Sequence, residues 1–247
     1  DASVLYGFYE RISGNLEPRK GRTLFGYDNA HFYLRVETEL PPEGTKLLSS
    51  IRKHDGKVYA DDSIEIWLAP ENGSHYYQYT INSFGTVSDM RFDRTGGVPD
   101  AAWNAGWRNA SRLDETRHLW IMEIAIPLKE LGITGTPDGK SFSLLVSRNW
   151  KRPWKQTPFI RNEAPFNDLS RYAKFTLNPE APSIQIEGIG AVEKQLFDLR
   201  GTIRNNSRTE KSYDLQLHFS HGDMPETKDS RRMTVAPGET KNFLFHD

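Results

Sequence analysis

The feature that most constrains this fold is a repeated alternation of apolar and polar residues with a period of two. A segment in which every second residue is apolar is typical of a strand with one buried face and one polar face. Strands of this kind are typical of antiparallel sheets. The pattern occurs in His31–Glu37, Ser63–Ala69, Tyr76–Asn82, Trp120–Ile126 and Phe142–Arg148. Its predicted buried side chains include Phe32, Leu34 and Val36 in the first segment and Ile64, Ile66 and Leu68 in the second.

Turn-forming residues separate these segments. Short strands with regular turns are typical of a sandwich or a barrel. The one helical signal is Pro127–Gly132, which has proline at its first position and glycine at its end. We therefore predict an all-β fold built as an antiparallel β-sandwich. The turns are expected at His54–Gly56, Glu71–Gly73, Gly96–Gly97 and Pro137–Gly139.

A proline-rich polar segment, Asn178–Ser183, predicts a boundary between two domains. We place the first domain at residues 1–178 and the second at residues 183–247. In the second, Phe197–Ile203 and Tyr213–Phe219 alternate again. About four or five strands are expected there, against the roughly seven of an immunoglobulin fold. We therefore predict a smaller, incomplete immunoglobulin-like β-sandwich segment.

The composition narrows the possible functions. The chain has 247 residues, with 32 Lys and Arg against 33 Asp and Glu, so no basic excess favours nucleic acid. It has no cysteine, which excludes disulfides, thiolate metal sites and a cysteine nucleophile. No apolar run is long enough for a membrane span. The chain begins with Asp1 and ends in an apparent strand, Lys241–Asp247, so we expect a mature form or part of a longer protein.

Alternation also predicts a polar face on two strands. In Ser63–Ala69, the face opposite the apolar side chains carries Glu65 and Trp67. In Tyr76–Asn82, the corresponding face carries Gln78, Thr80 and Asn82. If the strands are neighbours, one face carries a carboxylate, amides, a hydroxyl and an indole. Sugars are bound by aromatic planes and convergent polar groups of this kind. The alternative is a solvated outer face that binds nothing.

Two successive segments, Val58–Pro70 and Tyr77–Thr86, have the sequence pattern of a strand followed by a second strand and its turn. Through these segments, residues 1–178 resemble carbohydrate-binding module family 9. The resemblance implies a non-catalytic module that binds a polysaccharide or oligosaccharide. It also implies a larger exported protein, which is secreted, periplasmic or at the cell surface, with its other domains as partners. The remaining matching segments are Tyr27–Val36, Trp103 with Trp107, Trp120–Gly132 and Phe142–Trp150.

In that family two aromatic rings enclose a terminal sugar, and Glu, Arg, Asn and Gln side chains bind its hydroxyls. The resemblance makes Tyr59 the first ring, and it leaves Trp150 and Trp154 as alternatives for the second. Thr80 stands where the family has arginine, which leaves the ligand open. The predicted binding residues are Tyr59, Glu65, Gln78, Asn82, Arg148, Asn149, Trp150 and Trp154.

Several of these residues also have a structural interpretation. Tyr59 would cover a sheet edge, and Glu65 would pair with Arg148 across two strands. Trp150 and Trp154 stand among lysine and arginine residues, which is the composition of a cation–π surface patch.

The resemblance also implies structural calcium but no organic cofactor. Asp28, Asp55, Asp61 and Asp62 lie near predicted turns and offer the hard oxygen ligands that calcium prefers. The seven histidines lack the paired spacing typical of a zinc site.

Three other functions compete with glycan binding. A glycoside hydrolase needs two carboxylates about 5 to 9.5 Å apart, for which Glu65 and Glu123 are candidates, but the chain has no catalytic motif. We therefore predict that this chain is not an enzyme. A haem-binding sandwich would need Met90 together with His75 or His118. A scaffold segment would use the same polar face to contact another domain.

Overall fold

The computed structural model describes residues 3–191, 196–219 and 227–246, and the fold is all-β and antiparallel. The chain divides into two compact units, Gly7–Leu177 and Asn178–Asp247 together with Asp1–Tyr6. In the described part of the chain, no helix has the length and apolar character needed to cross a membrane.

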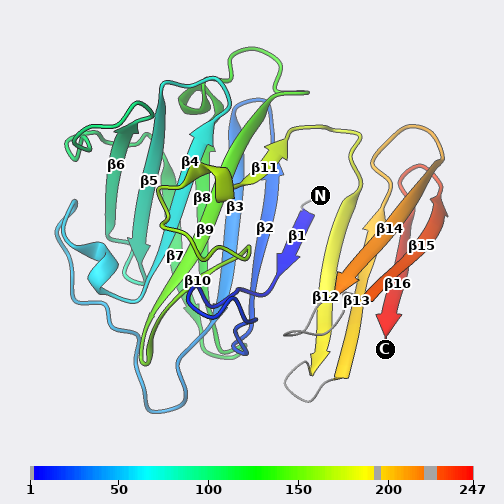
Figure 1. Cartoon of the computed structure of the whole chain (residues 1–247), viewed down its shortest axis with the longest axis horizontal. Coiled ribbons are helices and arrows are strands. Elements are labelled where there is room, and N and C mark those ends of the chain that lie inside the picture. The colour runs from blue at the N-terminus through cyan, green and yellow to red at the C-terminus, as the bar shows by residue number, and fades with distance from the viewer. Residues whose placement is uncertain (1–2, 192–195, 220–226, 247) are drawn as a thin grey trace. The chain divides into compact units, whose positions relative to one another are not determined.

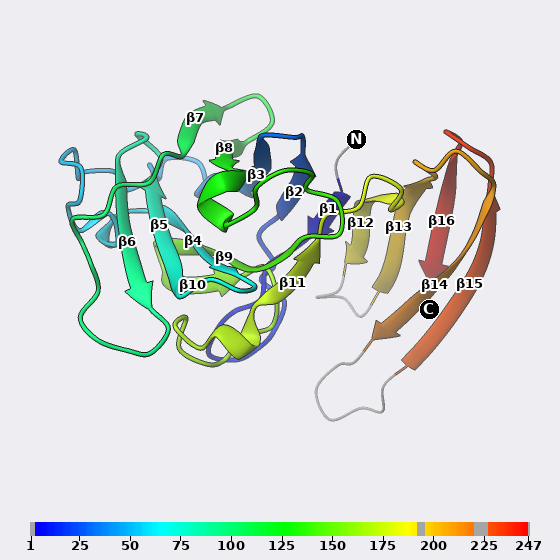
Figure 2. The ribbon, with the colours of Figure 1, turned by 90° about the horizontal axis from the view of Figure 1, so that it is seen from above.

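The larger unit is a sandwich of two sheets, as the alternation predicts. Figure 1 shows their strands, and Figure 2 shows the sheets as two layers. One sheet contains β2 (Gly21–Tyr27), β3 (His31–Glu39), β8 (Leu119–Pro127) and β7 (Arg108–Asp114), in that order. The second runs in the order β10 (Trp154–Pro158), β9 (Ser141–Lys151), β4 (Ser63–Pro70), β5 (His75–Asn82) and β6 (Val87–Asp93), and β11 (Ala173–Thr176) also pairs with β9.

The inner faces of the two sheets form the main core. Every predicted inward side chain of β3 and β4 is at most 2% exposed. Burial of such apolar side chains contributes about 1.5–3 kcal/mol each, so the alternating strands stabilise the sandwich only when both sheets close on each other. The predicted turn at Pro127–Gly132 is confirmed as the 3-10 helix η2 (Leu128–Leu131). Gly132 ends it with φ 70°, a left-handed conformation that favours glycine.

The outer face of β4 is covered as well, so all eight of its residues are buried. Phe166 and Tyr172, on either side of the 3-10 helix η3 (Leu169–Arg171), pack with Trp67 and Leu145 in a second apolar cluster. The alternation predicted one solvated face for β4. The covering segment removes that face from water at its apolar end.

The smaller unit contains two further sets of paired strands. β12 (Ser183–Ala191), β13 (Leu196–Arg204) and β16 (Thr240–His246) form one sheet in that order, and β14 (Lys211–Phe219) pairs with β15 (Thr227–Val235). β1 (Ser3–Tyr6) belongs to this unit too. Its apolar core includes Ile203, Val235, Phe243 and Phe245. The immunoglobulin-like architecture stays a prediction, and Asp247 of the predicted last strand lies outside the described residues.

A buried ion pair joins β9 to the start of β4. The Arg148 guanidinium is fully buried, and its Nη2 donates to Asp62 Oδ1 at 2.9 Å. It also lies 4.8 Å from the ring centre of Trp120 and 4.3 Å from that of Trp150. Burial lowers the pKa of Arg148, and the Asp62 carboxylate opposes that shift. A buried charge of this kind depends on its ion-pair partner, because water cannot reach the site to take the place of that partner.

We therefore expect Asp62→Ala to destabilise the larger unit by about 3–5 kcal/mol, since it leaves Arg148 charged, buried and unpaired. Urea unfolding followed by tryptophan emission measures this loss. The control is Glu71→Ala, which removes an exposed ion pair with Lys174 and should cost less than about 1 kcal/mol. Equal losses in the two variants would contradict the role given to Asp62.

Candidate functional site

Strand register places polar side chains of β4, β5 and β9 side by side on the outer face of the second sheet. Glu65 lies opposite Ser147 of β9 and Thr80 of β5. One row further, Asn149 and Asn82 flank the start of β4. The sequence expectation that β4 and β5 are neighbours is therefore confirmed.

Three side chains orient the Glu65 carboxylate, which is 4% exposed. Asn149 Nδ2 donates to Glu65 Oε1 at 2.7 Å. Trp67 Nε1 and Gln78 Nε2 donate to Oε2 at 3.1 and 3.2 Å. The alternative pairing of Glu65 with Arg148 does not form, because Arg148 points to the opposite face of β9. The carboxylate is thus held by neutral N–H groups.

Two polar atoms beside Glu65 accept no hydrogen bond within the protein. These are Ser147 Oγ and Asn149 Oδ1, on residues that are 0% and 1% exposed. A buried oxygen without a donor costs free energy, so such atoms are uncommon in folded proteins. Both oxygens are closed to solvent, so a hydroxyl group could satisfy them only after neighbouring side chains move aside.

The polar face continues to the end of the sheet where β9 turns into β10. Lys151 and Trp154 lie opposite each other, and Gln156 lies opposite Asn149. The Trp154 side chain is 56% exposed. Burial lowers the pKa of Lys151, although the nearby Asp62 and Glu65 charges oppose the shift.

Sequence analysis missed three residues of this face, Ser147, Lys151 and Gln156. The first two are found by counting two positions either way from Asn149 along the same strand face. Gln156 follows from the pairing of β10 with β9, which the sequence did not reveal.

Tyr59 lies at the same end of the sheet, in the 3-10 helix η1 (Val58–Ala60) that precedes β4. Its ring is 48% exposed. The buried Val58 beside it anchors the helix. Tyr59 and Trp154 are therefore exposed rings near the polar end of the second sheet, as is Phe84 in the turn after β5.

Asn82 has a structural role that uses its whole side chain. Its amide donates to Asp61 Oδ2 and to the Ile51 carbonyl, both at 2.9 Å. Its Oδ1 accepts from the Phe84 and Thr86 amides at 3.1 and 3.0 Å. Asn82 thus closes the turn after β5 and holds the loop before η1. We leave it out of the binding surface, because no polar atom of it remains for a ligand.

Arg148 and Trp150 are also left out of that surface. Successive residues of a strand point to opposite faces, so Arg148, Asn149 and Trp150 cannot share one side. Trp150 is 1% exposed, with the guanidinium groups of Arg19 and Arg148 at 3.7 and 4.3 Å from its ring centre. Of the two tryptophans proposed for the second ring, the structure exposes only Trp154.

Three of the four predicted calcium ligands do not fit a calcium site. Asp61 accepts from Ser50 and Ile51 as well as Asn82. Both oxygens of Asp62 accept hydrogen bonds, and so do both oxygens of Asp28. Calcium needs six to eight oxygen ligands that face the ion, and these carboxylates face N–H and O–H donors instead.

The structure does not bring the candidate catalytic pair together. Glu65 lies on the outer face of the second sheet. Glu123 lies on β8 of the first sheet, where its side chain is 52% exposed and pairs with Arg35.

The possible haem ligands are separated too. His118 lies between β7 and β8 of the other sheet from Met90. His75 lies on β5 beside β6, but Met90 is opposite Gln78, three positions from His75, so the two side chains point to opposite faces.

Comparisons with known proteins show the fold alone. No protein-family model matches the sequence, and no curated protein matches it. A solved protein from Bacteroides uniformis ATCC 8492, to which carbohydrate binding is attributed, aligns with a TM-score of 0.57 and 11% identity, over 71% of this chain and 86% of that one. A family 9 carbohydrate-binding module from Caldicellulosiruptor kristjanssonii, solved with cellotriose, aligns with a TM-score of 0.48 and 16% identity, over 71% and 83% of the two chains. The larger unit thus shares its β-sandwich fold with the Bacteroides uniformis protein.

The Asp61 carboxylate should make stability depend on pH. Burial raises its pKa, but the hydrogen bonds from Ser50, Ile51 and Asn82 together hold the pKa below its ordinary value. A lowered folded-state pKa contributes stability that is present above about pH 4 and is lost as the pH falls through the folded value. Asp61→Asn should therefore be less stable than wild type at pH 6, and the difference should shrink at pH 3. Urea unfolding at both pH values measures it, and an unchanged difference would contradict this role.

Proposed function

We propose that the outer face of the second sheet binds an oligosaccharide or polysaccharide, and that the chain is a non-catalytic glycan-binding module. The observation that carries the proposal is the pair of buried acceptors, Ser147 Oγ and Asn149 Oδ1, beside the oriented Glu65 carboxylate. The binding surface comprises Tyr59, Glu65, Gln78, Ser147, Asn149, Lys151, Trp154 and Gln156. The fold shared with the Bacteroides uniformis protein supports the same function.

The chemistry of this surface suits a sugar. Hydroxyl groups can donate to Glu65, Ser147 and Asn149, and they can accept from the Lys151 ammonium group. Because Glu65 is already held by three N–H donors, it needs little reorganisation to accept another. Such hydrogen bonds add selectivity more than net affinity, because the sugar gives up bonds to water when it binds.

The exposed rings supply the apolar part of the interaction. A pyranose ring presents C–H groups on its faces, and an indole or phenol plane can cover them. Trp154 and Tyr59 are two of the exposed aromatic side chains at this end of the sheet, and a third, Phe84, has the Arg52 guanidinium 3.8 Å from its ring centre. We propose that the first two rings stack on the sugar while Glu65, Ser147 and Asn149 bind its hydroxyls.

A panel of soluble oligosaccharides, titrated against tryptophan emission with calcium and then with chelator, tests the proposal. A saturable response to one sugar class supports glycan binding. A flat response across the panel, together with a stable contact between this chain and another domain of the same protein, would favour the scaffold function instead.

Trp154→Ala should weaken binding by about 1–3 kcal/mol, because it removes a stacking ring while leaving the hydrogen-bonding cluster in place. Isothermal titration calorimetry measures this without relying on the deleted fluorophore. The matched control is Tyr33→Ala, which removes another exposed ring from β3 of the first sheet and should leave affinity unchanged. Equal affinities of wild type and Trp154→Ala would remove Trp154 from the site.

Ser147→Ala should weaken glycan binding without lowering the stability of the protein. Its hydroxyl oxygen is buried and unpartnered, so its removal should leave the free energy of unfolding equal or higher. Glycan binding should weaken by about 0.5–1.5 kcal/mol, the value of one hydrogen bond. Thr38→Val is the control, since Thr38 Oγ1 on β3 is also buried and unpartnered but lies in the other sheet. A Ser147→Ala variant that is destabilised, with unchanged affinity, would show a purely structural hydroxyl.

A further inference from the structure

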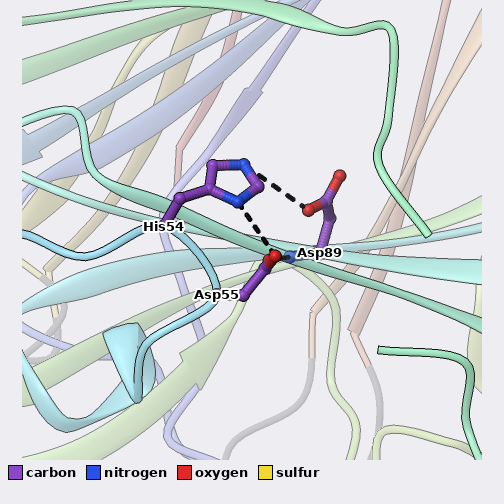
Figure 3. A group of neighbouring side chains, drawn as sticks. All are labelled: His54, Asp55 and Asp89. Atoms are coloured by element: carbon purple, nitrogen blue, oxygen red, sulfur yellow. Dashed lines mark hydrogen bonds and ion pairs between the residues drawn. The ribbon is translucent and has the colours of Figure 1, made fainter. Parts of the chain in front are cut away.

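Three potential metal ligands meet at the edge of the second sheet. Figure 3 shows the His54 imidazole between the carboxylates of Asp55 and Asp89. His54 Nδ1 is 3.0 Å from Asp55 Oδ2, and His54 Nε2 is 3.8 Å from Asp89 Oδ1. One donor atom from each of the three residues lies within 4.8 Å of the others.

Asp89 gives this cluster its strongest indication of a ligand. It lies on β6 and is 2% exposed. Its Oδ2 accepts from the Ala105 amide, whereas its Oδ1 accepts no hydrogen bond and points toward His54. Burial raises the pKa of Asp89, and the Asp55 charge adds to this effect, while the Ala105 amide and His54 oppose it. A cation at Oδ1 would compensate a buried charge that the protein leaves without a donor.

The backbone holds the two carboxylates close together before any ion binds. The Asp55 amide donates to the Val87 carbonyl at 3.0 Å, and the Asp89 amide donates to Asp55 Oδ1 at 3.4 Å. Asp55 itself has φ 59°, in the left-handed region. The turn at His54–Gly56 is therefore fixed against β6, and its side chains face Asp89.

We propose that His54, Asp55 and Asp89 bind one divalent transition-metal ion, for which Zn²⁺ is the representative. Zinc takes imidazole nitrogen and carboxylate oxygen at about 2.0–2.2 Å, which places tetrahedral donors about 3.3 Å apart. One donor atom from each residue already lies within 4.8 Å of the others. The spacings of 3.0 and 3.8 Å start from different imidazole nitrogens, so a single ion would bind one of them after the exposed side chains turn toward it. The His54 and Asp55 side chains are 49% and 33% exposed, so they can rotate toward Asp89 until all three residues reach one ion. Water would be a further ligand.

The donor set favours zinc over calcium. Imidazole suits zinc, copper and nickel, whereas calcium takes six to eight oxygen ligands. This cluster offers one nitrogen and two carboxylates. The sequence did not predict it because Asp89 follows Asp55 by 34 positions and no second histidine stands at a zinc-site spacing.

Zinc at this position would cross-link the turn before η1 to β6. Through Asp89 it would also hold the backbone at Ala105. An ion that binds only the folded state raises the unfolding temperature in proportion to the logarithm of its concentration above Kd. Zinc should therefore stabilise the larger unit.

Calorimetric titration of the chelator-treated full chain with ZnCl₂ at pH 7 tests the proposal. We expect one zinc ion at this site, bound at least tenfold more weakly by His54→Ala and by Asp89→Asn. His54 is exposed, so His54→Ala should fold even if Asp89→Asn does not. The control is His31→Ala, which removes a histidine lying 3.9 Å from a single carboxylate, Asp28, and should bind zinc as wild type does. Zinc should also raise the unfolding temperature of wild type more than that of His54→Ala.

Three results would overturn the proposal. The first is equal zinc affinity of wild type and His54→Ala. The second is binding of CaCl₂ but not of ZnCl₂ at this cluster. The third is that neither ion binds, while wild type loses stability as the pH rises from 6 to 8 and His54→Ala does not. That result would identify a protonated imidazole as the cation between the two carboxylates.

Discussion

Two adjacent buried carboxylates, Asp61 and Asp62, fix the point at which β4 begins. Asp61 accepts hydrogen bonds from the loop at Ser50 and from the turn held by Asn82. Asp62 accepts from Arg148 and from the Lys151 amide at the end of β9. Both acids point away from water, so their donors must stay in place for the fold to be stable. The register that sets Glu65 opposite Ser147 depends on these anchors.

That register divides the outer face of the second sheet into two parts. At one end, Trp67 and Leu145 are covered by the segment that carries Phe166. At the other end lie Glu65, Ser147 and Asn149. The Ser147 Oγ and Asn149 Oδ1 atoms accept no hydrogen bond within the protein. The covering segment supplies apolar burial, which stabilises the sheet, and leaves the polar end to its own hydrogen bonds. The same strands therefore serve both the core and the proposed binding surface.

Alternation within Ser63–Ala69 was enough to predict the buried face of β4 and the outward direction of Glu65. It was not enough to predict that β4 is buried on both sides, because residues 159–172 have no strand pattern that would reveal a cover. The family resemblance grouped Arg148, Asn149 and Trp150 into one site, although strand alternation alone separates them. The zinc cluster depends on a turn pairing with β6, and such long-range contacts leave no spacing in the sequence.

The position of the proposed glycan site is tested most directly by amide chemical-shift mapping of ¹⁵N-labelled protein, titrated with the oligosaccharide that binds most tightly. We predict that the perturbed amides cluster around Glu65, Ser147, Asn149 and Trp154, with those of β3 and β8 unchanged. Perturbations centred on the first sheet or on residues 178–247, or none with any glycan, would contradict the assignment of the site.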